Sequence, residues 1–239
     1  IQRMVREKGL EPVWKKYVEA TGELSRLCYR EEIEAAMRTK DLSGISLLGL
    51  QDFPGQGTAL VGMLDSHLEP KPFDFVKPEN FRAFFKEQLV LVGLEKYTYE
   101  EGETLCADVQ VANYGKTDCD GDLEWTLWAY MPNEELDSVR KVAVKSGHMS
   151  AASCPNGTLS KAGTYFLNVL EKNIELNNKI TAPVRCDLTV KIADAVNSYP
   201  IWIYKNEMPK CPESVYETTK LDLQAKKVLD NGGIVYYSP

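Results

Sequence analysis

The sequence lacks several signals that would point to a metal-binding or nucleic-acid-binding protein. Its 239 residues contain no CxxC pair and no cluster of cysteine with histidine, which excludes zinc-finger and thioredoxin-like sites. The two histidines, His67 and His148, are isolated, so we expect no metal site and no histidine-based catalysis. There is no basic run and the net charge is -7, so neither nucleic acid nor an anionic membrane surface is an expected partner.

Long apolar runs are also missing. No stretch of about 20 apolar residues could span a membrane, and no apolar signal segment precedes the first expected helix. The chain begins with Ile1 rather than methionine and ends on a strand-like segment, residues 234–239, so we expect it to be a piece of a longer protein. With 44% hydrophobic residues it has enough apolar side chains for one large core or two ordinary ones.

The cysteines do not define a disulfide framework. They can be paired in many ways, and free thiols are the commoner state in a chain of this length. The six are Cys28, Cys106, Cys119, Cys154, Cys186 and Cys211. An acidic group at residues 118–124 is not a calcium loop, because Ala129 stands where the twelfth-position acid is required. We therefore expect no metal and no cofactor.

Residues 1–88 show helical periodicity that is interrupted by one short apolar run. Helices are predicted over residues 10–18, 23–40, 58–64 and 78–86. The apolar run at residues 45–50 predicts a strand that is buried on both faces, as in a parallel sheet. This order of elements is that of the closing unit of a (β/α)8 barrel, although a complete barrel takes about 250 residues.

Residues 89–205 change from helical to alternating periodicity. Strands are predicted over residues 89–94, 105–111, 123–130, 139–145, 164–170, 184–192 and 199–204. About seven short strands with turns between them are typical of an immunoglobulin-like β-sandwich. By alternation Cys106 faces outward and Cys186 inward, so the antibody-type disulfide is not expected. Pro200 indicates a sheet edge, where a missing N–H is tolerated.

Residues 206–239 resemble the opening of an α/β domain. A strand-like pair, Val215 and Tyr216, precedes a helical pattern, a glycine stop and a second strand. So few residues cannot bury a core of their own, so we expect this segment to dock on its neighbours or to be a truncated domain. The predicted fold class is therefore mixed α/β plus all-β: the closing part of a barrel, a sandwich, and the start of an α/β segment.

The candidate substrate-binding residues are Gln51, Asp52 and Gln56. Gln51 and Asp52 stand at the C-terminal end of the apolar strand, where ligand-facing groups gather in parallel α/β folds. Gln56 follows in a glycine-rich loop that lacks the lysine of a phosphate loop, which favours the rim of an active site. A carboxylate and amides can hold the hydroxyls of a bound ligand by hydrogen bonds. In the alternative interpretation, Asp52 caps the loop and Gln51 bonds to the backbone.

Two further groups carry weaker signals. Trp128 and Tyr130 project from the outer face of their strand, where they could stack on a ligand or pack against the barrel or a neighbouring sheet. Glu31, Glu32 and Glu34 form a carboxylate cluster in the middle of a helix and beside arginines. We expect that cluster to be a solvated helix face rather than a catalytic pair.

Four segments carry a resemblance to glycoside hydrolase family 2. GISLLGLQDFPGQGT at residues 44–58, preceded by CYREEIEAAMRT at residues 28–39, resembles the last helix, strand and loop of that family's catalytic barrel. DVQVANYG at residues 108–115 and NSYPIWIY at residues 197–204 are similar to the sandwich domain that follows the barrel. The closest resemblance is to bacterial β-galactosidase-like members, although these place a tryptophan near the strand end where this chain has Leu50 to Phe53.

The resemblance implies a retaining exo-β-glycosidase that hydrolyses O-glycosidic bonds in oligo- or polysaccharides. Such enzymes use two carboxyl groups about 5 Å apart, and in this family both glutamates come from barrel strands that would precede Ile1. No catalytic residue is therefore assigned to this chain, which alone should be inactive and should need the N-terminal remainder of its polypeptide. The resemblance also implies a bacterial, periplasmic or secreted enzyme with a carbohydrate substrate. Gln51, Asp52 and Gln56 would then contact the sugar, and Trp128 and Tyr130 are possible surface sugar contacts. The alternative is a non-catalytic carbohydrate-binding or structural sandwich module.

Overall fold

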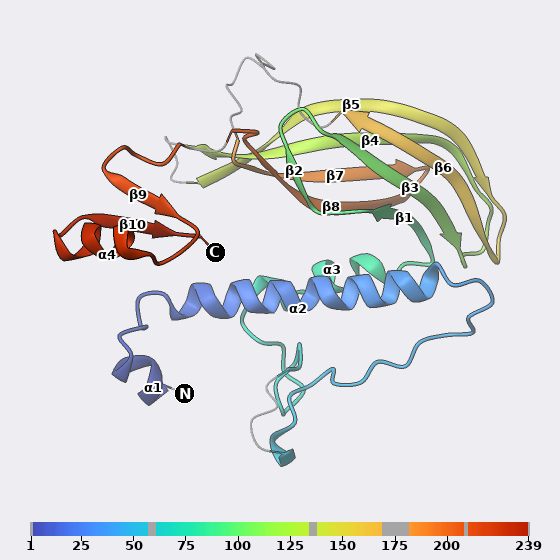
Figure 1. Cartoon of the computed structure of the whole chain (residues 1–239). Coiled ribbons are helices and arrows are strands. Elements are labelled where there is room, and N and C mark those ends of the chain that lie inside the picture. Colours follow the sequence, from blue (N-terminus) through green and yellow to red (C-terminus); the bar gives the residue numbers. More distant parts are fainter. Residues whose placement is uncertain (1, 57–60, 134–137, 169–181, 208–209, 239) are drawn as a thin grey trace. The chain divides into compact units, whose positions relative to one another are not determined.

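The computed structural model describes residues 2–56, 61–133, 138–168, 182–207 and 210–238. The chain divides into two compact units, Ile1–Tyr204 and Lys205–Pro239. The first unit contains the strands of two sheets together with a long helix, and the second is a small strand-helix-strand unit (Figure 1). Within the part of the chain that is described, no helix is both long enough and apolar enough to cross a membrane.

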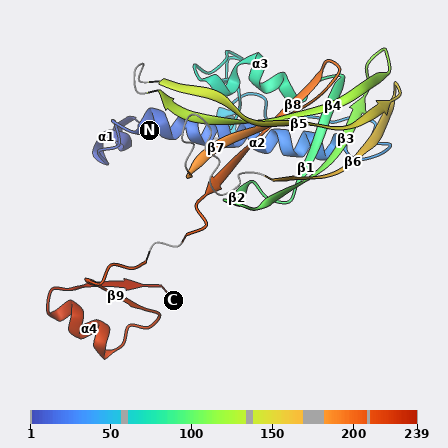
Figure 2. The ribbon, with the colours of Figure 1, turned by 90° about the horizontal axis from the view of Figure 1, so that it is seen from above.

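The first unit is built around a β-sandwich, as the alternating sequence pattern predicts (Figures 1 and 2). One sheet has three antiparallel strands in the order β1-β3-β6, which are Gln88–Leu94, Thr104–Asn113 and Thr158–Asn168. The other has five strands in the order β2-β8-β7-β4-β5. These are Thr98–Glu100, Ala195–Tyr204, Val184–Ile192, Cys119–Asn133 and Ser138–Cys154. Each predicted strand of this region is present over its described residues, while residues 169–170 of the strand predicted at 164–170 lie outside them. The short strand β2, of only three residues, was not predicted.

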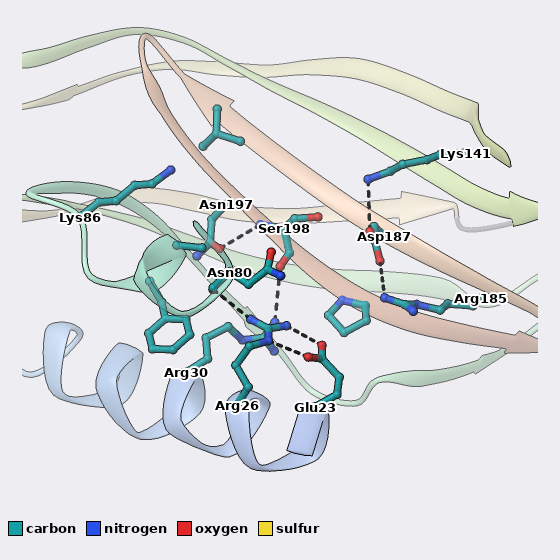
Figure 3. Close-up of a pocket in the computed structure, with 14 residues that line it drawn as sticks. Glu23, Arg26, Arg30, Asn80, Lys86, Lys141, Arg185, Asp187, Asn197 and Ser198 are labelled. Carbon is teal, nitrogen blue, oxygen red and sulfur yellow. Dashed lines mark hydrogen bonds and ion pairs between the residues drawn. The ribbon is translucent and has the colours of Figure 1, made fainter. Parts of the chain in front are cut away.

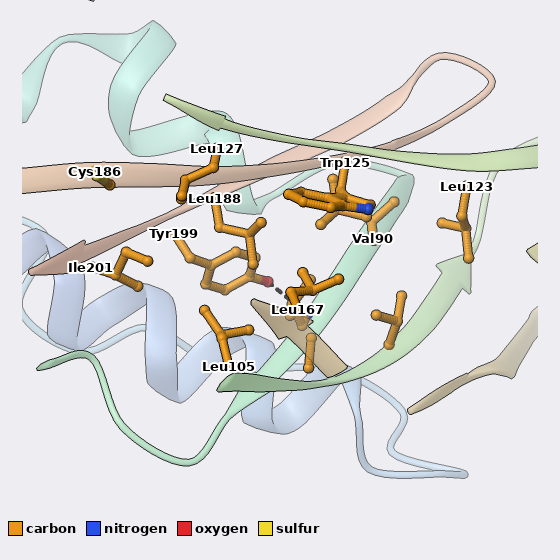
Figure 4. Packing of buried hydrophobic residues seen from close by; sticks show 14 of the residues in the cluster. Val90, Leu105, Leu123, Trp125, Leu127, Leu167, Cys186, Leu188, Tyr199 and Ile201 are labelled. Carbon is orange, nitrogen blue, oxygen red and sulfur yellow. Dashed lines mark hydrogen bonds between the residues drawn. The ribbon is translucent and has the colours of Figure 1, made fainter. Parts of the chain in front are cut away.

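The sandwich core is formed by the alternating apolar residues of the strands (Figure 4). Leu123, Trp125 and Leu127 of β4 are buried against Leu188 of β7 and Leu105 of β3. All six cysteines are free thiols, so the expectation that no antibody-type disulfide joins the sheets is confirmed. Cys119 and Cys154, both buried, lie opposite each other in the register of β4 and β5.

Strand β8 is not at the edge of its sheet, but Pro200 still lies where one side of β8 is open. The short strand β2 pairs only with Trp202, Ile203 and Tyr204 of β8. Pro200 itself lies opposite Asp187 of β7, on the other side of the strand. The local condition that tolerates a proline is therefore met, because no described strand pairs with β8 on that side at residue 200.

The N-terminal region contains one long helix where the sequence predicted two. Helix α1 covers Gln2–Glu7. Helix α2 covers Trp14–Met37 and is not interrupted at Gly22. The glycine does not break α2 because its missing side chain makes room for Phe75, which belongs to the 3₁₀ turn η2, Asp74–Val76. A Cβ atom at residue 22 would lie 2.1 Å from the Phe75 ring.

Replacing Gly22 with alanine is therefore expected to destabilise the chain. The helix gains about 1 kcal/mol of propensity, but overpacking typically costs about 1–3 kcal/mol and here meets an aromatic ring. Urea unfolding should show a lower midpoint than for the parent chain. Gly44→Ala is the matched control, because a Cβ atom there would meet nothing within 4 Å. Equal midpoints for the two variants would contradict the contact between α2 and Phe75.

The predicted barrel strand at residues 45–50 does not form a strand. The chain is irregular over these residues, and Gln51, just beyond them, makes an isolated parallel bridge with Leu64. Apolar side chains of the run are exposed, including Leu48 at 93%. A strand of a parallel sheet is stabilised by hydrogen bonds to neighbouring strands. No described strand pairs with this run, so the apolar pattern alone does not produce a strand. No barrel is closed among the described residues, so the predicted closing part of a barrel stays a prediction.

The helices expected around this run are only partly present. Residues 61–64 are not helical, since Leu64 instead bridges to Gln51 and Pro70, and the start of that predicted helix lies outside the described residues. A 3₁₀ turn, η1, covers Pro54–Gln56. The helix predicted at residues 78–86 is confirmed as α3, Pro78–Phe81, followed by the 3₁₀ turn η3, Arg82–Phe84.

Helix α2 lies along the side of the sandwich where β1 and β8 meet (Figure 1). Strand β1 pairs with β3 on one side only, so the other side of its backbone needs partners from elsewhere. Side chains supply them. The Val92 N–H donates to the Tyr199 hydroxyl at 2.9 Å, the Val90 carbonyl accepts from Asn197 at 2.9 Å, and the Val92 carbonyl accepts from Arg38 at 3.3 Å.

The second unit consists of β9, Val215–Thr218, helix α4, Leu223–Asp230, and β10, Ile234–Tyr237. The two strands are parallel, as the connecting helix requires. Asp222 caps α4 by accepting a hydrogen bond from the Ala225 N–H at 2.8 Å.

Candidate functional site

The predicted site residue Asp52 lies in a buried ion pair. Its side chain is 8% exposed, and its Oδ1 atom accepts hydrogen bonds from Lys71 Nζ and from the Gly62 N–H, each at 2.8 Å. Lys71 also donates to the Gly62 carbonyl at 2.6 Å. This arrangement matches the loop-capping interpretation of Asp52. Its second oxygen, Oδ2, accepts no hydrogen bond from the described residues.

The other two predicted substrate-binding residues lie next to Asp52 along the chain. Gln51 is exposed, and its backbone makes the isolated bridge with Leu64. Gln56 is the last residue of η1. The structure thus places the three residues in one loop region, but it does not test whether they contact a sugar, which stays a prediction.

A second candidate is a cavity of about 340 Å³ that the sequence did not reveal (Figure 3). It lies between α2, the segment around α3 and η3, and the outer face of the five-stranded sheet. Its polar lining comes from Glu23, Arg26, Arg30, Asn80, Lys86, Lys141, Arg185, Asp187, Asn197 and Ser198. These residues are spread over most of the first unit, so only the folded chain brings them together.

The wall formed by α2 carries two arginines that already have partners. Arg26 donates two hydrogen bonds to Glu23, at 2.8 and 2.6 Å. Arg30, 4% exposed, donates to Glu31 at 2.7 Å and lies 4.9 Å above the Tyr199 ring. Burial by itself lowers the pKa of Arg30, but the hydrogen bond and charge of Glu31 outweigh it and raise that pKa overall. Arg30 is therefore a fixed positive charge.

The wall formed by the sheet is centred on the carboxylate of Asp187. It accepts a short hydrogen bond from the Tyr130 hydroxyl and one from Lys141 at 3.2 Å, and a guanidinium nitrogen of Arg185 lies 3.7 Å away. Burial and the neighbouring carboxylate of Asp187 raise the pKa of Tyr130 to about 12, so its hydroxyl stays a donor at neutral pH.

The aromatic residues proposed as sugar contacts border this wall. Lys141 lies 5.4 Å from the centre of the Trp128 ring, and Arg185 lies 4.7 Å from that of Tyr130. Cations over aromatic faces are stabilised by the ring quadrupole. A sugar that stacked on either ring would compete with them. The sugar-contact role of Trp128 and Tyr130 stays a prediction.

The carboxylate cluster on α2 differs from the solvated face that the sequence predicted. Glu34 is fully buried, and it accepts hydrogen bonds from Asn197 at 2.8 Å, Tyr199 at 2.7 Å and Arg38 at 3.0 Å. Burial raises the pKa of Glu34, although these hydrogen bonds and nearby arginines oppose the shift. Of the cluster, Glu32 alone is exposed as expected.

Glu31 is half-buried and accepts a hydrogen bond from the Tyr97 hydroxyl at 2.6 Å. Burial by itself would raise the pKa of Glu31, but Tyr97 and Arg30 lower it further than burial raises it. A helical pattern could have identified the buried side of α2, because Arg30, Ile33 and Glu34, which are buried, and Met37, which is half-buried, follow the spacing of one helix face.

Comparisons with known proteins give limited matches. A family model described as "Domain of unknown function (DUF8488)" matches residues 103–205, which lie mostly in the sandwich. No curated protein matches the chain significantly.

Solved structures that resemble the chain include the sporulation control protein Spo0M from Bacillus subtilis. The identity is 16%, half of each chain is covered, and the TM-score is 0.37. Two glycosidase-type enzymes also match. A β-glucosidase from Listeria innocua has 15% identity, covering 49% of this chain and 16% of that one, with a TM-score of 0.32. A cycloisomaltooligosaccharide glucanotransferase from Paenibacillus has 10% identity, covering 59% and 18%, with a TM-score of 0.34.

The chain thus spans about half the length of the Spo0M chain and less than a fifth of either enzyme. At these TM-scores, the matches carry no argument about function. The assignment to glycoside hydrolase family 2 therefore rests on the sequence motifs and is a proposal.

Proposed function

We propose that the chain is the C-terminal part of a retaining exo-β-glycosidase similar to bacterial β-galactosidases. In this proposal residues 44–52 supply the closing strand of the catalytic barrel, and Gln51, Asp52 and Gln56 contact the sugar. The carbohydrate substrate is bound together with the N-terminal remainder of the polypeptide, which supplies both catalytic glutamates. An enzyme of this kind would act in the periplasm or outside the cell.

The observation that carries the proposal is the uncovered apolar run that ends at Asp52. Leu48 is 93% exposed, and Ile45 and Leu50 are 48% and 40% exposed. Burying a leucine or isoleucine side chain contributes about 1.5–3 kcal/mol, so such a run is unfavourable in water. Neighbouring strands and covering helices of a barrel would bury it. The run is also the segment with the most specific resemblance to the family.

Asp52 is suited to hold a substrate hydroxyl in such a site. Lys71 and the Gly62 N–H occupy Oδ1 and fix the orientation of the carboxylate, while Oδ2 accepts nothing among the described residues. A carboxylate oxygen held in this way can accept a hydrogen bond from a sugar hydroxyl without first being ordered. The chain would thus contribute substrate positioning rather than proton transfer.

The test compares hydrolysis of chromogenic β- and α-glycosides by three proteins: this chain, the chain expressed with the coding sequence that precedes it in its gene, and the Asp52→Ala variant of that longer protein. We expect the longer protein to hydrolyse β-glycosides and this chain to be inactive. Asp52→Ala should lower kcat/KM about 30-fold, which corresponds to about 2 kcal/mol of transition-state stabilisation.

Lys71→Met provides the control for a purely structural role of Asp52. It removes the ion pair but keeps the carboxylate, so a smaller loss of kcat/KM than for Asp52→Ala supports direct sugar contact. Turnover by the 239-residue chain alone would overturn the proposal. Saturable sugar binding without turnover by the longer protein, lost in Trp128→Ala, would favour the alternative of a carbohydrate-binding module.

A further inference from the structure

We propose that the cavity between α2, η3 and the five-stranded sheet binds a small organic anion, of about the size of one sugar, through an oxyanionic group such as a carboxylate. The proposal is independent of the glycosidase assignment, because Gln51, Asp52 and Gln56 do not line this cavity. Figure 3 shows its charged lining.

The first observation is the charge of the lining. Five cationic side chains face two carboxylates, those of Glu23 and Asp187, in a chain whose net charge is -7. The cations are Arg26, Arg30, Lys86, Lys141 and Arg185. A concave site with a surplus of one sign concentrates the opposite charge, and here the surplus is positive.

The second observation is that two of the cations have hydrogen-bond donors to spare. Lys86 makes no hydrogen bond or ion pair with the described residues. Arg185 donates no side-chain hydrogen bond within the described part of the chain, since Asp187 at 3.7 Å is beyond hydrogen-bond range. Arg26 and Arg30, by contrast, already donate to carboxylates.

The third observation is the placement of these two cations. Figure 3 shows Lys86 toward one end of the cavity and Arg185, with Lys141, toward the other. Lys86 follows η3 in the chain, whereas Arg185 belongs to β7 on the sheet wall. A ligand in the cavity would therefore meet the Lys86 ammonium and, from a different wall, a guanidinium that contacts Asp187 and Tyr130 but has hydrogen-bond donors to spare.

These groups select the chemical class of the ligand. A guanidinium presents a planar fork of donors that matches carboxylate and other oxyanions, and an ammonium adds a point charge. The neutral groups of Asn80 and Ser198 also line the cavity and can bond to hydroxyls. Its volume of about 340 Å³ is at the lower end of the range for small-molecule sites, which favours one sugar-sized unit.

Titration calorimetry of the full 239-residue chain tests the proposal with three probes: glucuronate, glucose and inorganic phosphate. We expect saturable binding of glucuronate that weakens as salt is raised, and no binding of glucose, which has the same ring without the charge. Phosphate that binds as tightly as glucuronate would overturn the sugar-sized organic ligand, because the sugar ring would then add no affinity, and would leave only a site for free oxyanions. Absence of binding by both anions would overturn the proposal.

Variants locate the site. Lys86→Ala and Arg185→Ala should each weaken glucuronate binding about 10-fold, the size expected for losing one charged hydrogen bond. Lys116→Ala is the control, because it removes an equal charge from an exposed turn outside the cavity and should leave the affinity unchanged. Arg185 contacts Tyr130, so its variant could loosen the sheet, whereas Lys86 makes no hydrogen bond or ion pair with the described residues, so its variant isolates the effect of the charge. Affinity that falls equally in all three variants would contradict a site in this cavity.

Discussion

Replacing Glu34 with alanine is expected to lower the free energy of unfolding by at least about 3 kcal/mol, the cost of removing one partner from a buried charged pair. The carboxylate is fully buried and accepts hydrogen bonds from Asn197, Tyr199 and Arg38. Without it, the amide of Asn197 and the hydroxyl of Tyr199 each lose an acceptor between α2 and the sandwich. Urea unfolding followed by circular dichroism measures the change.

Glu32→Ala is the matched control for this prediction. It removes the same side chain from the same helix at an exposed position two residues away, so its effect should stay within about 0.5 kcal/mol. If Glu34→Ala proved as mild as Glu32→Ala, the docking of α2 on the edge of the sandwich would be wrong.

The buried carboxylate also has a pH signature. Burial raises the pKa of Glu34 above its ordinary value of 4.5, so the folded chain binds this proton more tightly than the unfolded chain. Its contribution to stability is therefore fully present below pH 4.5 and falls as the pH rises through the folded pKa. Glu34→Gln lacks this proton. The difference in unfolding free energy, wild type minus Glu34→Gln, should accordingly be largest at low pH and decline as the pH is raised.

Replacing Phe84 with alanine is expected to cost about 3–5 kcal/mol, the range for a large aromatic side chain removed from a core. The side chain is 1% exposed, and its ring lies 5.3 Å from that of Phe81 and 5.1 Å from that of Phe85. It also forms part of the cavity wall next to Lys86. The unfolding free energy from urea titration is the measurement.

Phe85→Ala serves as the comparison for Phe84, because the neighbouring ring is 44% exposed. It should cost about 1 kcal/mol, the centre of the distribution for point variants. Phe84→Leu keeps most of the apolar volume and should fall between the two. Equal losses for the two alanine variants would show that η3 does not pack as described.

The β-sandwich was the part of the fold that the sequence predicted well. Alternation of apolar and polar residues in a strand depends only on which face is buried, and β4 shows this directly, with Leu123, Trp125 and Leu127 inside. The run at residues 45–50 gave an equally clear pattern but no strand. A parallel strand needs partners from distant segments, and the run finds none among the described residues.

The continuity of α2 and the two candidate sites depended on contacts that the sequence does not display. In the sequence Gly22 lies between the two predicted helices, whereas in the structure α2 continues through it and Phe75 occupies the space beside it. Asp52 stands out in the sequence as a polar residue at the end of an apolar run, but its partner Lys71 is 19 residues further along the chain. The cavity joins α2 to β7 and β8, so no local pattern of residues could have indicated it.

The side chains that hydrogen-bond to the free backbone edge of β1 also limit strand pairing between copies of the protein. An edge strand with open N–H and carbonyl groups is a template on which another chain can add a strand, the first step of aggregation. On β1, Tyr199, Asn197 and Arg38 already occupy those groups, and α2 lies over them. An incoming strand would have to break this network before it formed its first hydrogen bond. The buried carboxylate of Glu34 accepts hydrogen bonds from all three side chains, so it also opposes intermolecular strand pairing.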